Sequence, residues 1–238
     1  MAIAIVSRRI SAPCRAALEG EGFSVLPCPE SKELPPPIAH HPDMIMASIL
    51  GRIYCHETYI KETEAFFHVL HSLAPHLEVI GLPDAPGASY PTDCAYNLLP
   101  MGDKVFYNPK GLSPALSDVL SKNELRACHT RQGYTACTVR ALGAHHAITA
   151  DAGMAAALMR EGISALTIEE GHIALPPYAH GFIGGASGCF HKTAYFFGDI
   201  KKHPDHRAIE RFSREAGFSM RSLSDAPLCD LGGILFIE

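Results

Sequence analysis

The sequence lacks the features that mark several large classes of protein. No apolar run approaches the roughly 20 residues that a membrane-spanning helix needs. There is also no block of like charge and no low-complexity tract. The formal net charge of −5 and the isoelectric point of about 6.3 give no reason to expect nucleic acid or an anionic membrane as a partner. We therefore expect a small-molecule ligand instead, while the sequence leaves the oligomeric state open.

The cysteines also lack the spacing of known frameworks. The chain has eight of them, but no two form a C-x-x-C pair, so we predict neither a zinc site nor a disulfide scaffold. The start, Met1–Val6, is too short for the apolar region of a signal peptide and runs straight into Ser7, Arg8 and Arg9. We expect a soluble, reduced, cytoplasmic protein that holds no metal and no cofactor.

The stretch from Asp151 to Ile200 predicts one structural unit. Asp151 suits the N-cap of a helix and Gly162 its left-handed stop. The β-branched and apolar residues of Ile163–Ile168 suit a strand. A corner that carries His172 follows, and then a glycine-rich turn and another strand. The unit is therefore a helix, a strand, a corner and a strand.

The rest of the chain repeats this unit. Predicted helices begin at intervals of roughly 40–50 residues, near Ser11, Glu57, Ser113, Asp151 and Pro204. The first strand, Ala2–Val6, has no helix before it, and the last unit ends early. This strand could therefore complete the last sheet and close a ring. We predict one α/β domain over residues 1–238, a closed propeller of five units.

Such a ring resembles the pentein, or guanidine-modifying enzyme (GME-fold), superfamily. Its Thr167–Leu175 segment, with the turn behind it, is similar to the histidine-bearing unit of dimethylarginine dimethylaminohydrolases. The chain also resembles an uncharacterised GME-fold family in three segments, His41–Met44, Tyr90–Asn97 and Gly181–Gly188. The glycines of the last segment lead into a strand and not a helix, so they do not form a phosphate-binding loop.

The resemblance implies chemistry on guanidino or amidino compounds. In the superfamily a cysteine thiolate attacks the guanidinium carbon, a histidine moves protons and carboxylates hold the cation. His172 matches the family histidine in position, so it is the candidate acid or base, with Asp93 as its catalytic carboxylate. The alternative for His172 is a corner histidine that hydrogen-bonds only to the backbone.

The corners of the five units supply the remaining candidates. In a propeller they would converge near the axis and form a polar pocket for a cationic ligand. The residues that we predict to bind this ligand are His41, Asp43, Asn97, Thr135, Ser187 and Asp230. The alternative role for Asp43 and Asp93 is that of a turn residue, because aspartate often hydrogen-bonds to the backbone of its own turn.

The nucleophile is where the chain departs from the family. The family cysteine stands at the start of the final strand, and here that place is held by Gly232 and Gly233. Cys229 is the nearest thiol and the candidate nucleophile, but a three-residue offset reverses the side-chain direction on a strand. Two functions therefore stay open. One is a hydrolase or transferase for guanidino compounds, and the other is a non-catalytic protein that binds a small molecule or a macromolecule.

Overall fold

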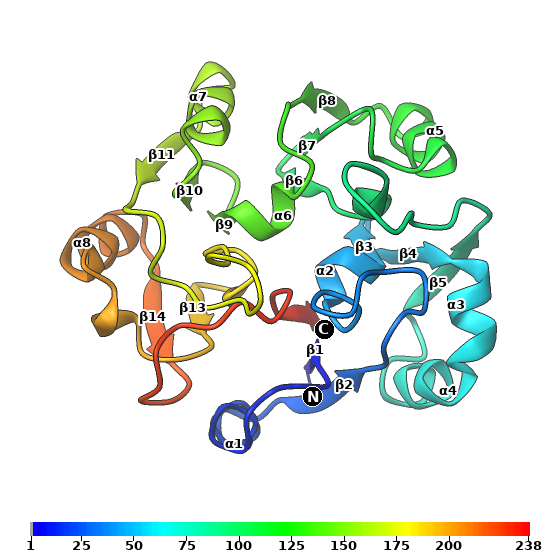
Figure 1. Ribbon diagram of the computed structural model, residues 1–238, viewed down its shortest axis with the longest axis horizontal. Coiled ribbons are helices and arrows are strands. Elements are labelled where there is room, and N and C mark those ends of the chain that lie inside the picture. Colours follow the sequence, from blue (N-terminus) through cyan, green and yellow to red (C-terminus); the bar gives the residue numbers. More distant parts are fainter. Residues whose placement is uncertain (1) are drawn as a thin grey trace.

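Five three-stranded sheets stand in a ring around a central axis in the computed structural model, which describes residues 2–238 (Figure 1). In every sheet the middle strand pairs antiparallel with the first strand and parallel with the third. The first strands are β15 (Leu235–Ile237), β3 (Met46–Ile49), β6 (Leu99–Met101), β9 (Val139–Leu142) and β12 (Ser187–Phe190). The middle strands are β1 (Ile3–Ser7), β4 (Arg52–His56), β7 (Lys104–Tyr107), β10 (His146–Thr149) and β13 (Thr193–Phe196). The third strands are β2 (Ser24–Cys28), β5 (Glu78–Leu82), β8 (Arg126–His129), β11 (Ser164–Thr167) and β14 (Ser219–Ser222).

Helices connect the middle and third strands, because a parallel pair needs a crossover connection. They lie on the outside of the ring (Figure 1) and are α1 (Ala12–Gly20), α3 (Glu57–Glu62) with α4 (Glu64–Leu73), α5 (Pro114–Lys122), α7 (Ala152–Arg160) and α8 (His206–Glu215). The side chain of Asp151 caps its helix, as predicted, and those of Ser11 and Ser113 also cap the helices that begin there. None of the helices in residues 2–238 has the length and apolar character that crossing a membrane requires.

Two local predictions differ from the structure. The apolar pattern predicts one helix from Glu57 to Leu73, but the helix is broken at Thr63, whose hydroxyl donates to the Tyr59 carbonyl (2.6 Å). The corners are also more helical than expected. Short helical turns precede three of the first strands, namely α2 (Pro42–Ile45), η1 (Thr92–Cys94) and α6 (Thr135–Thr138). A last such turn, η2 (Ile200–Lys202), precedes α8.

The two ends of the chain close the ring, as the sequence predicts. Strand β1 is the middle strand of a sheet whose first strand is β15, with Ile3 opposite Ile237. The hydrophobic core also crosses the boundary between the first and last units, since Val6 and Leu18 belong to one cluster with Tyr195 and Phe197. The predicted five-unit α/β propeller is therefore confirmed.

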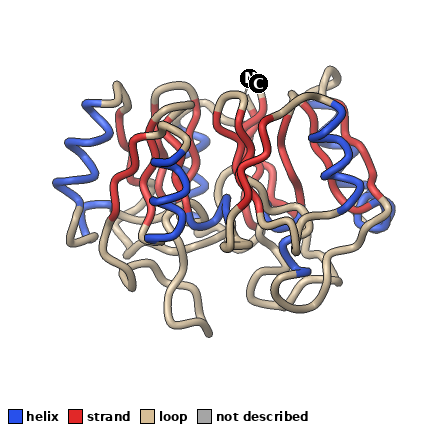
Figure 2. The backbone as a smooth tube through the Cα atoms, turned by 90° about the horizontal axis from the view of Figure 1, so that it is seen from above, coloured by secondary structure: helices blue, strands red, loops and turns tan. Residues whose placement is uncertain are grey.

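The ring has two different ends, which Figure 2 shows from the side. At one end are both termini and the tight hairpins that join first and middle strands, and we call it the hairpin end. At the other end are the longer loops and the five segments that lead into the first strands. We call these segments the corners and this end the corner end. Because the first strands lie nearest the axis, every corner reaches the middle of the ring.

Candidate ligand sites on the ring axis

The five corners are joined to one another by hydrogen bonds around the axis. We call this closed set the corner ring. Its bonds are Asp43 N to Gly232 O (3.1 Å), Gly233 N to Gly185 O (2.7 Å), Gly185 N to Cys137 O (2.9 Å), Ala136 N to Asn97 Oδ1 (2.8 Å) and Asn97 Nδ2 to Asp43 O (3.0 Å). Each corner is thus held by its two neighbours, which fixes the side chains that it presents to the axis.

Two buried carboxyl groups lie in the corner ring, those of Asp43 and Asp230. Burial and the negative charge of Asp43 raise the pKa of Asp230 to about 7. Burial also raises the pKa of Asp43, to about 6. The oxygens of Asp230 accept hydrogen bonds from the N–H groups of Phe182 (2.9 Å) and Gly232 (3.0 Å). Both oxygens of Asp43 are buried, and neither accepts a hydrogen bond of ordinary geometry within residues 2–238.

A pocket of about 160 Å³ lies on the corner side of this ring, and we call it the corner pocket. It is lined by Ile38, His41, Met44, Tyr134, Cys137, Leu175, Tyr178, His180, Phe182 and Asp230. Nδ1 of His41 lies 3.7 Å from the Asp230 carboxylate. Burial and the neighbouring His40 lower the pKa of His41 to about 3, so its imidazole is uncharged at neutral pH. Asp230 is therefore the anionic group of this pocket.

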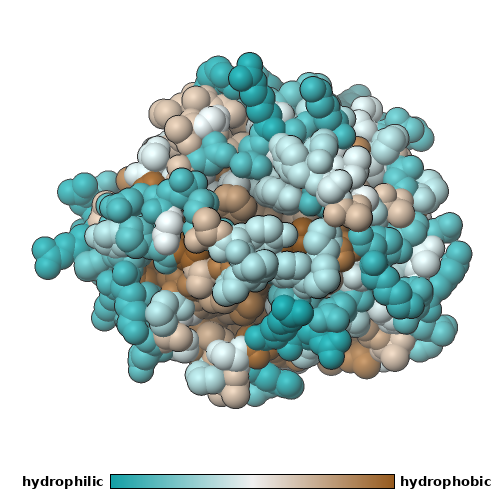
Figure 3. Space-filling view, viewed as in Figure 1, coloured by the Kyte–Doolittle hydropathy of each residue, from teal (hydrophilic) through white to brown (hydrophobic). Residues whose placement is uncertain are grey.

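The face of the molecule seen in Figure 1 is the corner end, and the residues in its middle are apolar, as most of the corner pocket lining is. The loop between β11 and β12, yellow in Figure 1, lies over the middle of the ring. Figure 3 views the same face and shows hydrophobic residues gathered in its hollowed middle, with hydrophilic residues around them. A ligand that enters here meets apolar and aromatic groups before it reaches the carboxyl group.

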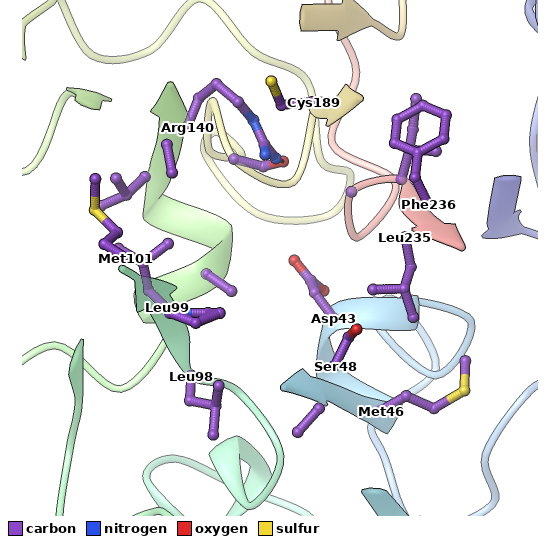
Figure 4. Close-up of a pocket in the computed structure, with 18 of the residues that line it drawn as sticks. Asp43, Met46, Ser48, Leu98, Leu99, Met101, Arg140, Cys189, Leu235 and Phe236 are labelled. Carbon is purple, nitrogen blue, oxygen red and sulfur yellow. Dashed lines mark hydrogen bonds between the residues drawn. The ribbon is translucent and has the colours of Figure 1, made fainter. Parts of the chain in front are cut away.

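A larger cavity of about 430 Å³ lies on the hairpin side of the corner ring, and we call it the axial cavity. Residues of all five first strands line it, together with Gly102, Gly143 and His191 at the hairpins. The Asp43 carboxylate and the Arg140 guanidinium face the same space (Figure 4). Burial lowers the pKa of Arg140, but a guanidinium stays charged in proteins.

Three of the predicted site residues make hydrogen bonds that hold the corners in place. The Asp93 carboxylate accepts a hydrogen bond from the Tyr134 hydroxyl (2.7 Å). The Thr135 hydroxyl donates to the Phe106 carbonyl (3.1 Å) and so ties its corner to β7. The Asn97 side chain makes two of the hydrogen bonds of the corner ring. Asp93 and Thr135 therefore hold the corners in place, as Asn97 does.

The predicted catalytic histidine and cysteine are not among the residues that line either axial site. The His172 side chain is 39% exposed, and Nε2 lies 3.0 Å from Oε1 of Glu169. It lines a pocket of about 200 Å³ that shares His180 and Phe182 with the corner pocket. The corner that reaches the axis is Phe182–Ala186, at the end of the long β11–β12 connection. The Cys229 thiol is in contact with the carbonyl of Asp230 (3.8 Å) and outside the lining of the corner pocket.

Sequence reasoning missed three groups that line these sites. Tyr134 and His180 lie in the corner pocket, and Arg140 lies in the axial cavity. The signal for Arg140 is a single charged residue inside the apolar strand Val139–Leu142, which faces the axis. Ser187, a predicted ligand-binding residue, uses its hydroxyl to accept a hydrogen bond from Arg140 (2.8 Å).

The arrangement of five α/β units is that of the pentein fold. Solved structures with this fold resemble the whole chain. A mutant of dimethylarginine dimethylaminohydrolase from Pseudomonas aeruginosa, complexed with citrulline, is 11% identical, with 94% of this chain and 91% of that chain covered and a TM-score of 0.57. For the agmatine deiminase of C. jejuni the values are 8% identity, 93% and 76% coverage and a TM-score of 0.53. SxtG, an amidinotransferase of the saxitoxin pathway of Microseira wollei, is 11% identical, with 91% of this chain and 77% of that chain covered and a TM-score of 0.55.

Identities of this size show the fold alone, and the sequence places the chain more narrowly. The model of the Family of unknown function (DUF6873) matches residues 5–235, and the chain belongs to this family. No curated protein matches the chain in sequence. The fold that the superfamily resemblance implies is therefore confirmed.

Proposed function

We propose that the protein binds a small, planar cation of the guanidino or amidino class in the corner pocket. The observation that carries this proposal is the buried Asp230 carboxyl group in a pocket otherwise lined by apolar and aromatic side chains, two histidines and a thiol. A carboxylate pairs well with the planar N–H groups of a guanidinium. The aromatic rings of Tyr134 and Phe182, whose centroids lie 6.3 Å apart, offer faces on which a cation is attracted. Dimethylarginine and agmatine, which the structural neighbours' names contain, are guanidino compounds.

We further propose that binding occurs without the covalent chemistry of the superfamily. By the sequence resemblance, Gly232 and Gly233 stand where the superfamily has its nucleophile. Cys229, the nearest thiol in sequence, lies outside the pocket lining. His172 lies in another pocket. These placements favour a binding protein over a hydrolase.

The affinity for a cation is expected to rise with pH. Since the pKa of Asp230 is raised to about 7, the carboxyl group is mostly protonated at pH 6 and mostly ionised at pH 8. Only the ionised form attracts a cation, so binding should strengthen by about tenfold over this interval. His41 does not titrate there, because its pKa is lowered to about 3.

Asp230→Asn is expected to weaken binding of ethylguanidine at pH 8 by about 10–150-fold. The estimate follows from the 1.5–3 kcal/mol (roughly) that a hydrogen bond to a charged group contributes. The substitution should also remove most of the pH dependence between pH 6 and 8. Isothermal titration calorimetry with ethylguanidine and agmatine measures both effects, and thermal unfolding checks that the variant is folded.

Asp118→Asn, at an exposed position on α5, is the matched control and should bind as the wild type does. The proposal is wrong if neither compound binds to the wild type at pH 8. It is equally wrong if Asp230→Asn, once shown to be folded, binds ethylguanidine with unchanged affinity.

A covalent reaction at Cys137 is the second candidate function. The observation in its favour is that Cys137 is the cysteine among the residues that line the corner pocket. Burial, with the charges of Asp43 and Asp230, raises the pKa of this thiol well above its usual value. A bound cation would offset those charges and favour the thiolate, which could then attack the guanidinium carbon.

If this reaction occurs, the wild type should release ammonia or amine from agmatine, and Cys137→Ser should lower the rate by at least about 10²-fold. Binding of ethylguanidine should survive the same substitution. Cys229→Ser is the control and should keep the rate. No release of ammonia or amine by the wild type would leave the protein as a binder.

A further inference from the structure

The axial cavity is a second candidate site, on the opposite side of the corner ring from the corner pocket. Its volume of about 430 Å³ falls within the range of small-molecule sites, roughly 300–1,000 Å³. It is lined by the first strands and by hairpin residues, so it opens at the hairpin end. The residues that line this cavity and those that line the corner pocket do not overlap. The two sites share only the corner ring, which forms the wall between them.

Arg140 presents unused hydrogen-bond donors in this cavity. Its Nε donates to the Ser187 hydroxyl (2.8 Å), and Nη2 donates to the carbonyls of Gly184 (2.7 Å) and Ser187 (2.7 Å). These bonds fix the plane of the guanidinium and use three of its five N–H groups. Within residues 2–238 the two N–H groups of Nη1 have no hydrogen-bond partner. The free donors of a buried cation suit an anionic acceptor.

Asp43 presents unused acceptors in the same cavity. Both carboxylate oxygens are buried, and neither has a hydrogen-bond partner in the described chain. The Cys137 thiol and the Arg140 charge lie near enough to lower the pKa of Asp43 slightly, but burial outweighs both. A cationic donor would satisfy this carboxylate.

The remaining labelled walls are mostly apolar. Leu98, Leu99 and Met101 come from β6 and the segment before it, and Leu235 and Phe236 come from β15 (Figure 4). A ligand with only an amine would leave Arg140 unsatisfied, and a ligand with only a carboxylate would leave Asp43 unsatisfied. A cation alone or an anion alone therefore satisfies only one of the two charged groups, Asp43 or Arg140.

We propose that the axial cavity binds a hydrophobic α-amino acid as its zwitterion. The carboxylate of the amino acid accepts hydrogen bonds from Nη1 of Arg140, and its ammonium group donates to Asp43. The aliphatic side chain lies between the strands β6 and β15. The site is distinct from the cation site, which uses Asp230 on the other side of the corner ring.

The first test uses ligands that carry one or both charged groups, so it needs no variant of the protein. L-Leucine and L-methionine should bind the wild type with dissociation constants below about 1 mM. Isoamylamine, which lacks the carboxylate of leucine, and isocaproate, which lacks the ammonium group, should each bind at least about tenfold more weakly. Isothermal titration calorimetry measures all four.

Asp43→Asn should weaken leucine by at least about tenfold, whereas isocaproate should bind no more weakly than it does to the wild type. Asp103→Asn, exposed at the hairpin end, is the control and should bind leucine as the wild type does. The proposal is overturned if neither amino acid binds at about 10 mM, if isoamylamine or isocaproate binds as tightly as leucine, or if Asp43→Asn leaves leucine unaffected. Ethylguanidine binding, which tests the other site, can succeed or fail separately.

Discussion

Gly232→Cys is expected to destabilise the fold by about 2–5 kcal/mol. A Cβ atom at this position would lie 2.3 Å from Cβ and 2.4 Å from Cα of His41. The backbone φ of +77° adds about 1–2 kcal/mol for any L side chain, and the overlap adds roughly 1–3 kcal/mol. For a chain of this size the melting temperature should fall by about 4–20 °C. Thermal unfolding followed by circular dichroism measures it.

Gly233→Cys is the matched comparison. Its φ of +72° gives the same backbone strain, but the nearest atoms to a new Cβ are 3.4 Å away. We expect a loss of only about 1–2 kcal/mol. Equal losses in the two variants would mean that contact with His41 is not what keeps a side chain out of position 232.

Asn97→Ala is expected to lower the free energy of unfolding by about 2–5 kcal/mol. The side chain of Asn97 is buried and joins two corners, and its removal leaves the Ala136 N–H and the Asp43 carbonyl without partners. Each buried group left unsatisfied costs roughly 1–3 kcal/mol. Denaturation in urea measures the change.

Asn123→Ala is the control for this prediction. Asn123 is exposed at the end of α5, where its amide donates to the Val119 carbonyl (2.8 Å). Its replacement should cost less than about 1 kcal/mol. If Asn97→Ala cost no more than this control, the corner ring would not contribute to stability in the way that its hydrogen bonds indicate.

Much of the fold can be predicted from the sequence because its signals are local. Ser113 with Pro114, and Asp151 with Gly162, mark helix ends within a single turn. Strand pairing then follows from the repeat, since each unit forms the same three-stranded sheet. The break at Thr63 was not predicted, because the apolar pattern continues through it and only the backbone departs from the helix.

The sequence predicts the candidate site only in part, because the direction in which a side chain points depends on the course of the backbone through the whole ring. Asp43 and Asp230 were predicted at the axis and lie there, since corners that precede first strands must converge. His172 was placed at a corner, but the connection that carries it is long and reaches the axis only near Gly185. Arg140 was missed because its burial results from contacts with Gly184 and Ser187, far along the chain.

The pairing of β1 with β15 determines how the molecule can come apart. In a linear solenoid the end repeats have one neighbour each, so unfolding can start there and proceed repeat by repeat. In this ring every unit has two neighbours, and removing any one of them breaks two interfaces. Partial unfolding is therefore costly from every starting point, and the five units are expected to be lost together in one cooperative transition.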